Sequence, residues 1–217
     1  MNTPDLLTCD IARECCDFVD VYGGPAVPTN VTLMRRRVAG ILSTIESREA
    51  AQTQSYAEDE AATDERHAIR ERLFAKLRPV VTMAQTDLEH VPELGAMTLP
   101  DADGSAGLLI LAANSAADVA TRHAREFAGA GLDESVVAEL RSLAVRLGHA
   151  VTARQASLAW RRRNTAEIVD EALRLRRALK VLDSVMVAWL EADSELVAHW
   201  KAVSSGRAVV LVDRKAS

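Results

Sequence analysis

The chain has 217 residues, of which 48% are apolar but only 4% aromatic, and this length is enough to bury a sizeable core. Alanine, leucine and arginine are abundant and aromatic residues are scarce, whereas β-rich domains draw on β-branched and aromatic residues, so the composition argues against an all-β fold. The formal net charge of -5 is modest and gives no general reason to expect nucleic acid or an anionic membrane as a partner.

Residues 1–29 are expected to form an irregular N-terminal head. A short helix fits residues 6–16, and polar and apolar residues then alternate over 17–22, which suits a short strand. The glycines and prolines between residues 23 and 28 would stop any regular element at that point.

Three cysteines, Cys9, Cys15 and Cys16, lie close together in this head. An odd, clustered set does not suit a disulfide framework, and it lacks the paired Cys-x-x-Cys spacing that zinc sites commonly use. Acidic residues interrupt any apolar stretch near the N-terminus, so no signal peptide is recognised, and no apolar run is long enough to cross a membrane. We therefore expect reduced thiols in a cytoplasmic protein without a membrane partner.

A long helix is expected over residues 30–89, with Thr29 or Asn30 as its N-cap. Its first apolar residues recur at alternating steps of three and four, which is the spacing of a heptad seam. The residues of this stripe are Val31, Met34, Val38, Ile41 and Ile45, and the stripe resumes from Ile69 to Leu88.

Two features interrupt this helix. Residues 46–66 are polar and alanine-rich, so we expect them to be solvated or weakly packed. Pro79 removes one backbone hydrogen bond and crowds the preceding turn, so we expect a kink, or a break between two helices, at that position. The prolines and glycines over 90–107 then predict a connector.

The second half of the chain is expected to contain three more helices. The first covers about 108–128 and ends at Gly129 or Gly131, either of which can adopt the left-handed conformation of a C-cap. The second begins after Asp133, whose carboxylate suits the positive end of a helix dipole, and reaches about residue 162.

The last expected helix, over 165–203, has the clearest heptad pattern in the chain. Asn164 or Thr165 would be its N-cap, and a single helix that continues through this point is the alternative. The residues of its apolar stripe are Ile168, Ala172, Leu175, Leu179, Leu182, Met186, Trp189, Leu196 and Trp200.

The charges are distributed unevenly along the chain. Residues 46–66 contain seven acidic and two basic residues, whereas 140–180 contain ten basic and three acidic ones. We therefore predict that the basic helices pack against the acidic middle of the first long helix. The alternative is a phosphate-binding surface in which arginines supply charge and a tryptophan stacks on a base. The residues of this predicted partner-binding site are Trp160, Arg161, Arg162 and Arg163.

Two aspartate–histidine pairs, Asp64 with His67 and Asp87 with His90, are candidate metal ligands. Di-iron sites in helix bundles use a glutamate at that spacing together with further carboxylates in the core. We interpret the two pairs as polar helix surface, with a bundle metalloprotein as the alternative. No nucleophile elbow, P-loop or dinucleotide-binding glycine pattern is present, so we expect no catalytic activity and no cofactor.

These patterns predict an all-α fold, an antiparallel bundle of four to five helices with long, heptad-like members. The bundle domain would span 30–203, between the head and a C-terminal tail over 204–217, in which a short strand at 208–212 is left open as a pairing partner for 17–22. The expected function is that of a non-catalytic structural or interaction protein, a scaffold that self-associates or binds a helical partner protein. Nucleic-acid binding through the basic segment 140–180 is the alternative.

Overall fold

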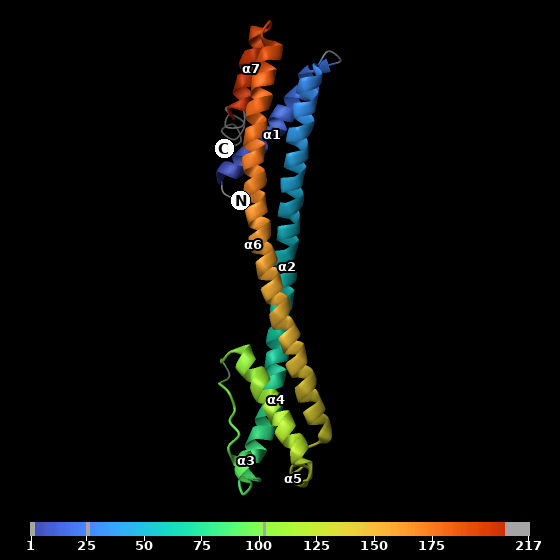
Figure 1. The fold of residues 1–217 in the computed structure, drawn as a ribbon, viewed down its shortest axis with the longest axis vertical. Helices are drawn as coiled ribbons and strands as arrows, with labels where there is room; N and C mark the ends of the chain where they lie inside the picture. Colours follow the sequence, from blue (N-terminus) through green and yellow to red (C-terminus); the bar gives the residue numbers. More distant parts are fainter. Residues whose placement is uncertain (1–2, 25–26, 102, 207–217) are drawn as a thin grey trace, which may run out of the picture. The chain divides into compact units, whose positions relative to one another are not determined.

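The computed structural model describes residues 3–24, 27–101 and 103–206. Every regular element within these ranges is a helix, so the fold is all-α, as expected (Figure 1). None of these helices is both long and apolar enough to span a membrane. The helices are α1 (Thr3–Tyr22), α2 (Thr29–Thr86), α3 (Pro92–Gly95), α4 (Ala106–Arg122), α5 (Ala124–Gly129), α6 (Glu134–Leu190) and α7 (Ser194–Ser204).

The internal contacts of the chain divide it into two compact units. Unit 1 combines Met1–Gln54 with Arg161–Ser217, and unit 2 is Ser55–Trp160. Helices α2 and α6 each contribute residues to both units. Each unit has its own cluster of buried apolar side chains, whereas the sequence led us to expect one domain over 30–203.

The core of unit 1 is formed by α1, the beginning of α2, the end of α6, and α7 (Figure 1). The two heptad stripes expected from the sequence both contribute buried side chains to this core, which confirms that they are packing surfaces. The side chains of these stripes that are fully inaccessible are Val31, Val38, Ile45, Leu175, Leu182, Met186 and Trp200.

The N-terminal segment is a helix, α1, which contains the short helix expected over 6–16 and extends beyond it at both ends, so this segment is not irregular. Its buried side chains recur with the helical period, so the apparent alternation over 17–22 belongs to a helical stripe and the expected strand there is wrong. The partner expected for that strand, 208–212, lies outside the described residues. The buried residues of α1 are Cys9, Ala12, Cys15, Cys16, Phe18 and Val19.

Helix α6 is continuous from Glu134 to Leu190, so neither Asn164 nor Thr165 is an N-cap. The alternative, one helix through this point, is the arrangement observed. Thr165 donates its hydroxyl hydrogen to the carbonyl of Arg161 (2.9 Å), which is the ordinary way for a threonine inside a helix to satisfy its side chain. Asn164 is buried instead, and its contacts are described below.

The apolar stripe expected over 165–203 is divided between two helices. Helix α6 ends at Leu190, and Asp193 is the N-cap of α7. The Asp193 Oδ1 atom accepts hydrogen bonds from the backbone amides of Glu195 (3.1 Å) and Leu196 (3.0 Å). These bonds satisfy amides at the start of a new helix, so the chain turns here and α7 contacts α1.

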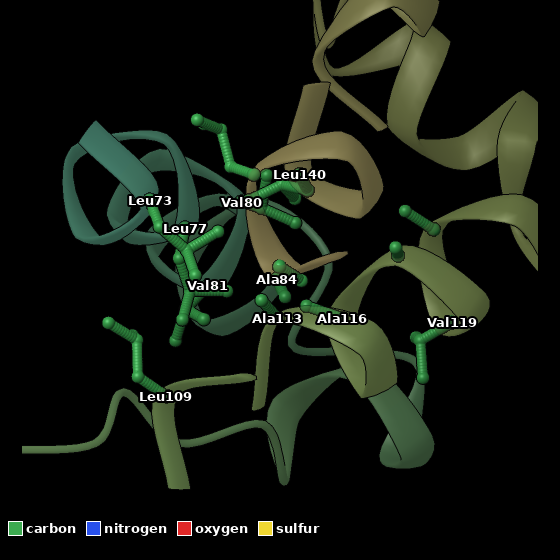
Figure 2. Close-up of a cluster of buried hydrophobic side chains, with 14 of the residues drawn as sticks. Leu73, Leu77, Val80, Val81, Ala84, Leu109, Ala113, Ala116, Val119 and Leu140 are labelled. Atoms are coloured by element: carbon green, nitrogen blue, oxygen red, sulfur yellow. The ribbon is translucent and has the colours of Figure 1, made fainter. Parts of the chain in front are cut away.

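The core of unit 2 is formed by the second half of α2, by α4 and α5, and by the beginning of α6 (Figure 2). Leu73, Leu77 and Val81 of α2 carry the large apolar side chains, and α4 faces them with small ones such as Ala113 and Ala116. Small residues on one helix let its backbone approach the other closely, because interaxial distance depends on the side chains at the contact. The resumed stripe from Ile69 to Leu88 is therefore confirmed as a packing surface.

Pro79 does not divide α2, so of the two alternatives expected there, a kink or a break between two helices, the break is wrong. The proline lies on the exposed side of the helix, whereas Leu77, Val80 and Val81 are buried on its other side. Packing of these three side chains stabilises the helical conformation on both sides of the proline and offsets the hydrogen bond that the proline removes.

The helix expected over 108–128 is divided at His123 into α4 and α5. After α5, Gly131 adopts a φ of 95°, in the left-handed region that favours glycine, as expected for the end of this segment. Asp133 then accepts a hydrogen bond from the amide of Ser135 (2.8 Å), which confirms it as the cap at the start of α6.

Candidate interaction site in the long helices

Each of the two long helices contains a stretch without an apolar core. We call these the polar stretches, and they are residues 46–68 of α2 and 148–167 of α6. The structure describes all of these residues, and among them only Asn164 is buried. The weakly packed middle expected for α2 is therefore confirmed, and α6 has a similar stretch that the sequence reasoning missed.

The composition of the polar stretches explains why they are helical. Alanine, glutamate, glutamine and arginine dominate them, and these residues have high intrinsic helix propensity. However, a helix without a buried apolar face gains little from tertiary packing. The stretches also carry large apolar side chains in exposed positions, namely Tyr56 (55% exposed), Leu158 (37%) and Trp160 (40%). They therefore offer apolar surface that this chain does not cover.

Within unit 1, Asn164 connects the two long helices through a polar network. Its Nδ2 atom donates to the backbone carbonyl of Arg48 (3.0 Å) and to Oε1 of Gln52 (3.4 Å). Its Oδ1 atom accepts from Nη1 of Arg48 (3.3 Å), and Arg48 also forms an ion pair with Glu167. Gln52 donates in turn to the hydroxyl of Thr165 (3.3 Å). Both donor positions and the acceptor of the buried amide are thus used.

Asn164 lies four residues before Ile168, at the next position of the same buried stripe. A polar residue at such a position lowers stability relative to an apolar one but specifies the register of the helices that pair there. The heptad spacing of the apolar residues extends back to Asn164 in the sequence, so this spacing already indicated a buried position there. We had assigned Asn164 to a helix cap, which its side chain type also suits.

The predicted charge complementarity is observed at one place and reversed at another. In unit 2, Glu65 of α2 pairs with Arg146 of α6 (3.3 Å), with the acidic residue on α2 as expected. In unit 1, the basic residue Arg48 is on α2 and the acidic residue Glu167 is on α6. All four side chains are a third or more exposed, so each pair contributes about 1 kcal/mol or less.

The four residues of the predicted partner-binding site are consecutive in α6. Trp160 belongs to unit 2 and Arg161 to unit 1. Arg161 is half-buried, whereas Arg162 and Arg163 are exposed. Successive helical residues point about 100° apart, so these arginines face different directions and do not form a single patch.

The described part of the chain contains no group of three or more histidine, cysteine, aspartate or glutamate side chains that could hold a metal ion. Asp64 and His67 are both exposed on α2. Asp87 and His90 follow the end of α2 at Thr86, so they do not share a helix face. The two pairs are therefore isolated from further ligands in these ranges.

The three cysteines are predicted to be unreactive in the folded protein. Burial raises the pKa of Cys9 to about 11, with a smaller contribution from Glu49, and raises the pKa of Cys15 to about 12. The pKa of Cys16 is also raised, mainly by burial. Because the thiolate is the reactive form, we expect an aromatic disulfide reagent at pH 8 to label the native protein at least about 100-fold more slowly than the unfolded chain.

The same shifts predict a loss of stability at alkaline pH. The thiols of the unfolded chain ionise near pH 9, whereas those of the fold hold their protons until about pH 11 to 12. Their contribution to stability is complete below about pH 9 and decreases as the pH rises through this interval. Denaturant titrations at pH 8 and pH 10.5 would measure this difference in the free energy of unfolding. In the labelling experiment, equal rates for native and unfolded protein would contradict the burial of the thiols.

Comparison with other proteins adds no constraint on function, because no protein family, no curated protein and no solved structure matches this chain.

Proposed function

We propose that this protein is a non-catalytic helical scaffold that self-associates, and that the polar stretches are the surface at which a second copy binds. The observation that supports this most directly is their burial pattern: in these described stretches the helices persist while Tyr56, Leu158 and Trp160 remain exposed. A second pair of helices packed against these side chains would supply the tertiary contacts that each copy lacks.

Charge supports a second copy as the partner. The α2 stretch is predominantly acidic, with exposed Glu60 and Asp64, whereas Arg162 and Arg163 are exposed on the basic α6 stretch. A copy bound in the opposite direction would bring the acidic stretch of one chain to the basic stretch of the other. Such complementarity selects the partner and its direction more than it adds affinity.

We further propose that α2 and α6 pair as antiparallel, heptad-packed members of the expected bundle. Contacts within each unit support this, because higher residue numbers on α2 meet lower ones on α6. In unit 1, Arg48 contacts Glu167 and Gln52 contacts Asn164. In unit 2, Glu65 contacts Arg146 and Lys76 contacts Glu139. The free, buried cysteines suit the reducing cytoplasm that we infer for this scaffold.

Charge reversal tests the proposed self-association. Glu60→Lys combined with Asp64→Lys is expected to convert a dimer into a monomer, or to weaken it at least about tenfold, because the acidic stretch would then repel the basic one. Adding Arg162→Glu and Arg163→Glu to the same chain is expected to restore association, since the signs are again complementary. Light scattering after size-exclusion chromatography measures the mass at about 10 to 200 μM protein and low salt.

A matched control changes the same amount of charge elsewhere. Glu14 and Asp170 are exposed acidic residues outside the polar stretches, on α1 and α6, and replacing both with lysine should leave the mass unchanged. A wild-type protein that remains a monomer throughout this concentration range would refute self-association. Equal effects of the control and the test variant would refute the assignment of the surface.

Nucleic-acid binding is a second candidate function, and the exposure of Arg162 and Arg163 favours it. Phosphate contacts are strongest at low ionic strength, so binding should be visible at about 50 mM salt and should weaken steeply as salt is added. Arg162→Ala with Arg163→Ala would weaken it across all sequences. The absence of binding to both DNA and RNA at that salt concentration would remove this candidate.

A further inference from the structure

Unit 2 contains a groove with a volume of about 650 Å³ along one face of α2. This volume is within the usual range of small-molecule sites, about 300 to 1,000 Å³. Asp103, from the connector between α3 and α4, lines the groove opposite α2. The residues that α2 contributes are His67, Arg70, Glu71, Phe74, Ala75, Arg78 and Pro79.

The two walls of the groove are held together by hydrogen bonds from α2 to the connector backbone. Gln85 Nε2 donates to the carbonyl of Met97 (2.7 Å), and Arg70 Nη2 donates to the carbonyl of Gly104 (2.5 Å). The first bond attaches the connector to α2 at Met97, and the second attaches it at Gly104. The groove therefore exists before any ligand binds, which reduces the ordering cost of binding.

One row of side chains along α2 supplies positive charge and an aromatic ring. Arg70, Phe74 and Arg78 are spaced by four residues, so they lie one above another on the same helix face. The guanidinium of Arg78 lies over the ring of Phe74, 5.5 Å from its centroid. A planar guanidinium stacked on a ring presents donors for a carboxylate at its edge and a flat surface for a second ring.

A second row supplies hydrogen-bond acceptors. Pro79 has no backbone N–H, so the carbonyl of Ala75 lacks the donor that a residue four positions later normally provides in a helix. Both residues line the groove, so a backbone carbonyl without its usual helical donor belongs to the groove lining. Glu71, one turn before Ala75, and Asp103, opposite, add two carboxylates. The proline that α2 tolerates is thus placed where its missing hydrogen bond leaves an acceptor for a ligand.

We propose that this groove binds a small zwitterion that carries an aromatic ring, the chemistry of a free aromatic amino acid. The ligand carboxylate binds the arginines, its ammonium group binds the acceptors formed by Glu71, Asp103 and the Ala75 carbonyl, and its ring stacks against Arg78 and Phe74. The presence of both signs of charge disfavours a simple anion or a simple cation. A peptide segment is also disfavoured, because no internal residue offers both a free ammonium and a free carboxylate.

Titration of the isotope-labelled full chain with L-phenylalanine, followed by NMR, tests the proposal. Saturable shifts of amide signals between residues 67 and 79 are expected. Three analogues each lack one group: 3-phenylpropanoate has no ammonium, phenethylamine has no carboxylate, and L-alanine has no ring. Each is expected to bind about tenfold more weakly or worse, because each lacks one of the three contacts proposed for the zwitterion.

Two variants and one control locate the site. Arg78→Ala should weaken L-phenylalanine binding at least about tenfold, whereas Arg72→Ala, an exposed arginine of α2 outside the groove, should leave it unchanged. Pro79→Ala is the sharper test, because it gives the Ala75 carbonyl an N–H partner. We expect it to raise the melting temperature and to weaken binding at the same time.

No saturable shift up to about 20 mM L-phenylalanine would overturn the proposal. Equal binding of L-phenylalanine and its analogues would overturn the zwitterion assignment, and equal losses for Arg72→Ala and Arg78→Ala would overturn the location. Undiminished binding by Pro79→Ala would show that the Ala75 carbonyl is not an acceptor. These results are independent of self-association, because the polar-stretch variants leave the groove residues in place.

Discussion

Replacement of Trp200 by alanine is expected to lower the free energy of unfolding of unit 1 by about 3–5 kcal/mol. Trp200 is fully buried in α7, and its Nε1 atom donates a hydrogen bond to Oδ1 of Asp183 in α6 (2.8 Å). Its ring meets that of Phe18 in α1 edge to face, with centroids 5.3 Å apart. This side chain of α7 therefore contacts two other helices of the core, α1 and α6, and its loss leaves a large cavity.

Trp160 provides a control with the same substitution. It is 40% exposed in unit 2, so at a protein concentration at which the proposed dimer dissociates, Trp160→Ala should change stability by less than about 1 kcal/mol. Trp200→Phe would retain an aromatic ring but lose the hydrogen bond to Asp183, at a cost of about 1–2 kcal/mol beyond repacking. Denaturant unfolding followed by circular dichroism measures all three variants. Equal destabilisation by Trp160→Ala and Trp200→Ala would contradict the described core.

Leu77→Ala is the corresponding change in unit 2, with an expected cost of about 2–5 kcal/mol. Leu77 is fully buried in the cluster to which α2, α4 and α6 contribute (Figure 2). Because the two units have separate cores, hydrogen exchange should accelerate first in α4, α5 and the adjoining part of α6. The amides of α1 and α7 should remain protected, and Trp200→Ala should give the opposite pattern.

The control for this substitution is Leu111→Ala, since Leu111 is 66% exposed on α4. It should change stability by less than about 1 kcal/mol. If Leu77→Ala accelerates exchange equally in α1, α4 and α7, the two units unfold as one cooperative whole, and their separate cores do not correspond to separate folding units.

The long helices and their buried faces could be predicted from the sequence because their signal is local and repeated. Val31, Val38 and Ile45 each support the same helical stripe, as do Leu175, Leu182 and Met186 in α6. A stripe of this kind tolerates single ambiguous residues, since the remaining members still define the buried face. The polar interruption over 46–66 could also be predicted, because the repeated apolar positions of the stripe are missing there.

The helix ends and the contacts between segments could not be predicted in this way. A residue such as Asn164 suits either an N-cap or a buried seam position, and only its neighbours in space, Arg48 and Gln52, decide between them. The apolar stripe over 165–203 predicted one helix, although the carboxylate of Asp193 caps the start of a second one, α7. The groove in unit 2 depends on the path of the connector beside α2, which no periodic pattern encodes.

The buried amide of Asn164 also bears on how errors in folding are avoided. Helices with repetitive apolar stripes can collapse while displaced by one heptad, because each displaced apolar residue still meets another apolar residue. In one such displacement Asn164 would face Ile41 and Ile45 in place of Arg48 and Gln52, and its donors and acceptor would be buried without partners at a cost of about 1–3 kcal/mol. A misaligned intermediate of this kind would separate and pair again, so one polar side chain corrects the alignment of a long apolar seam.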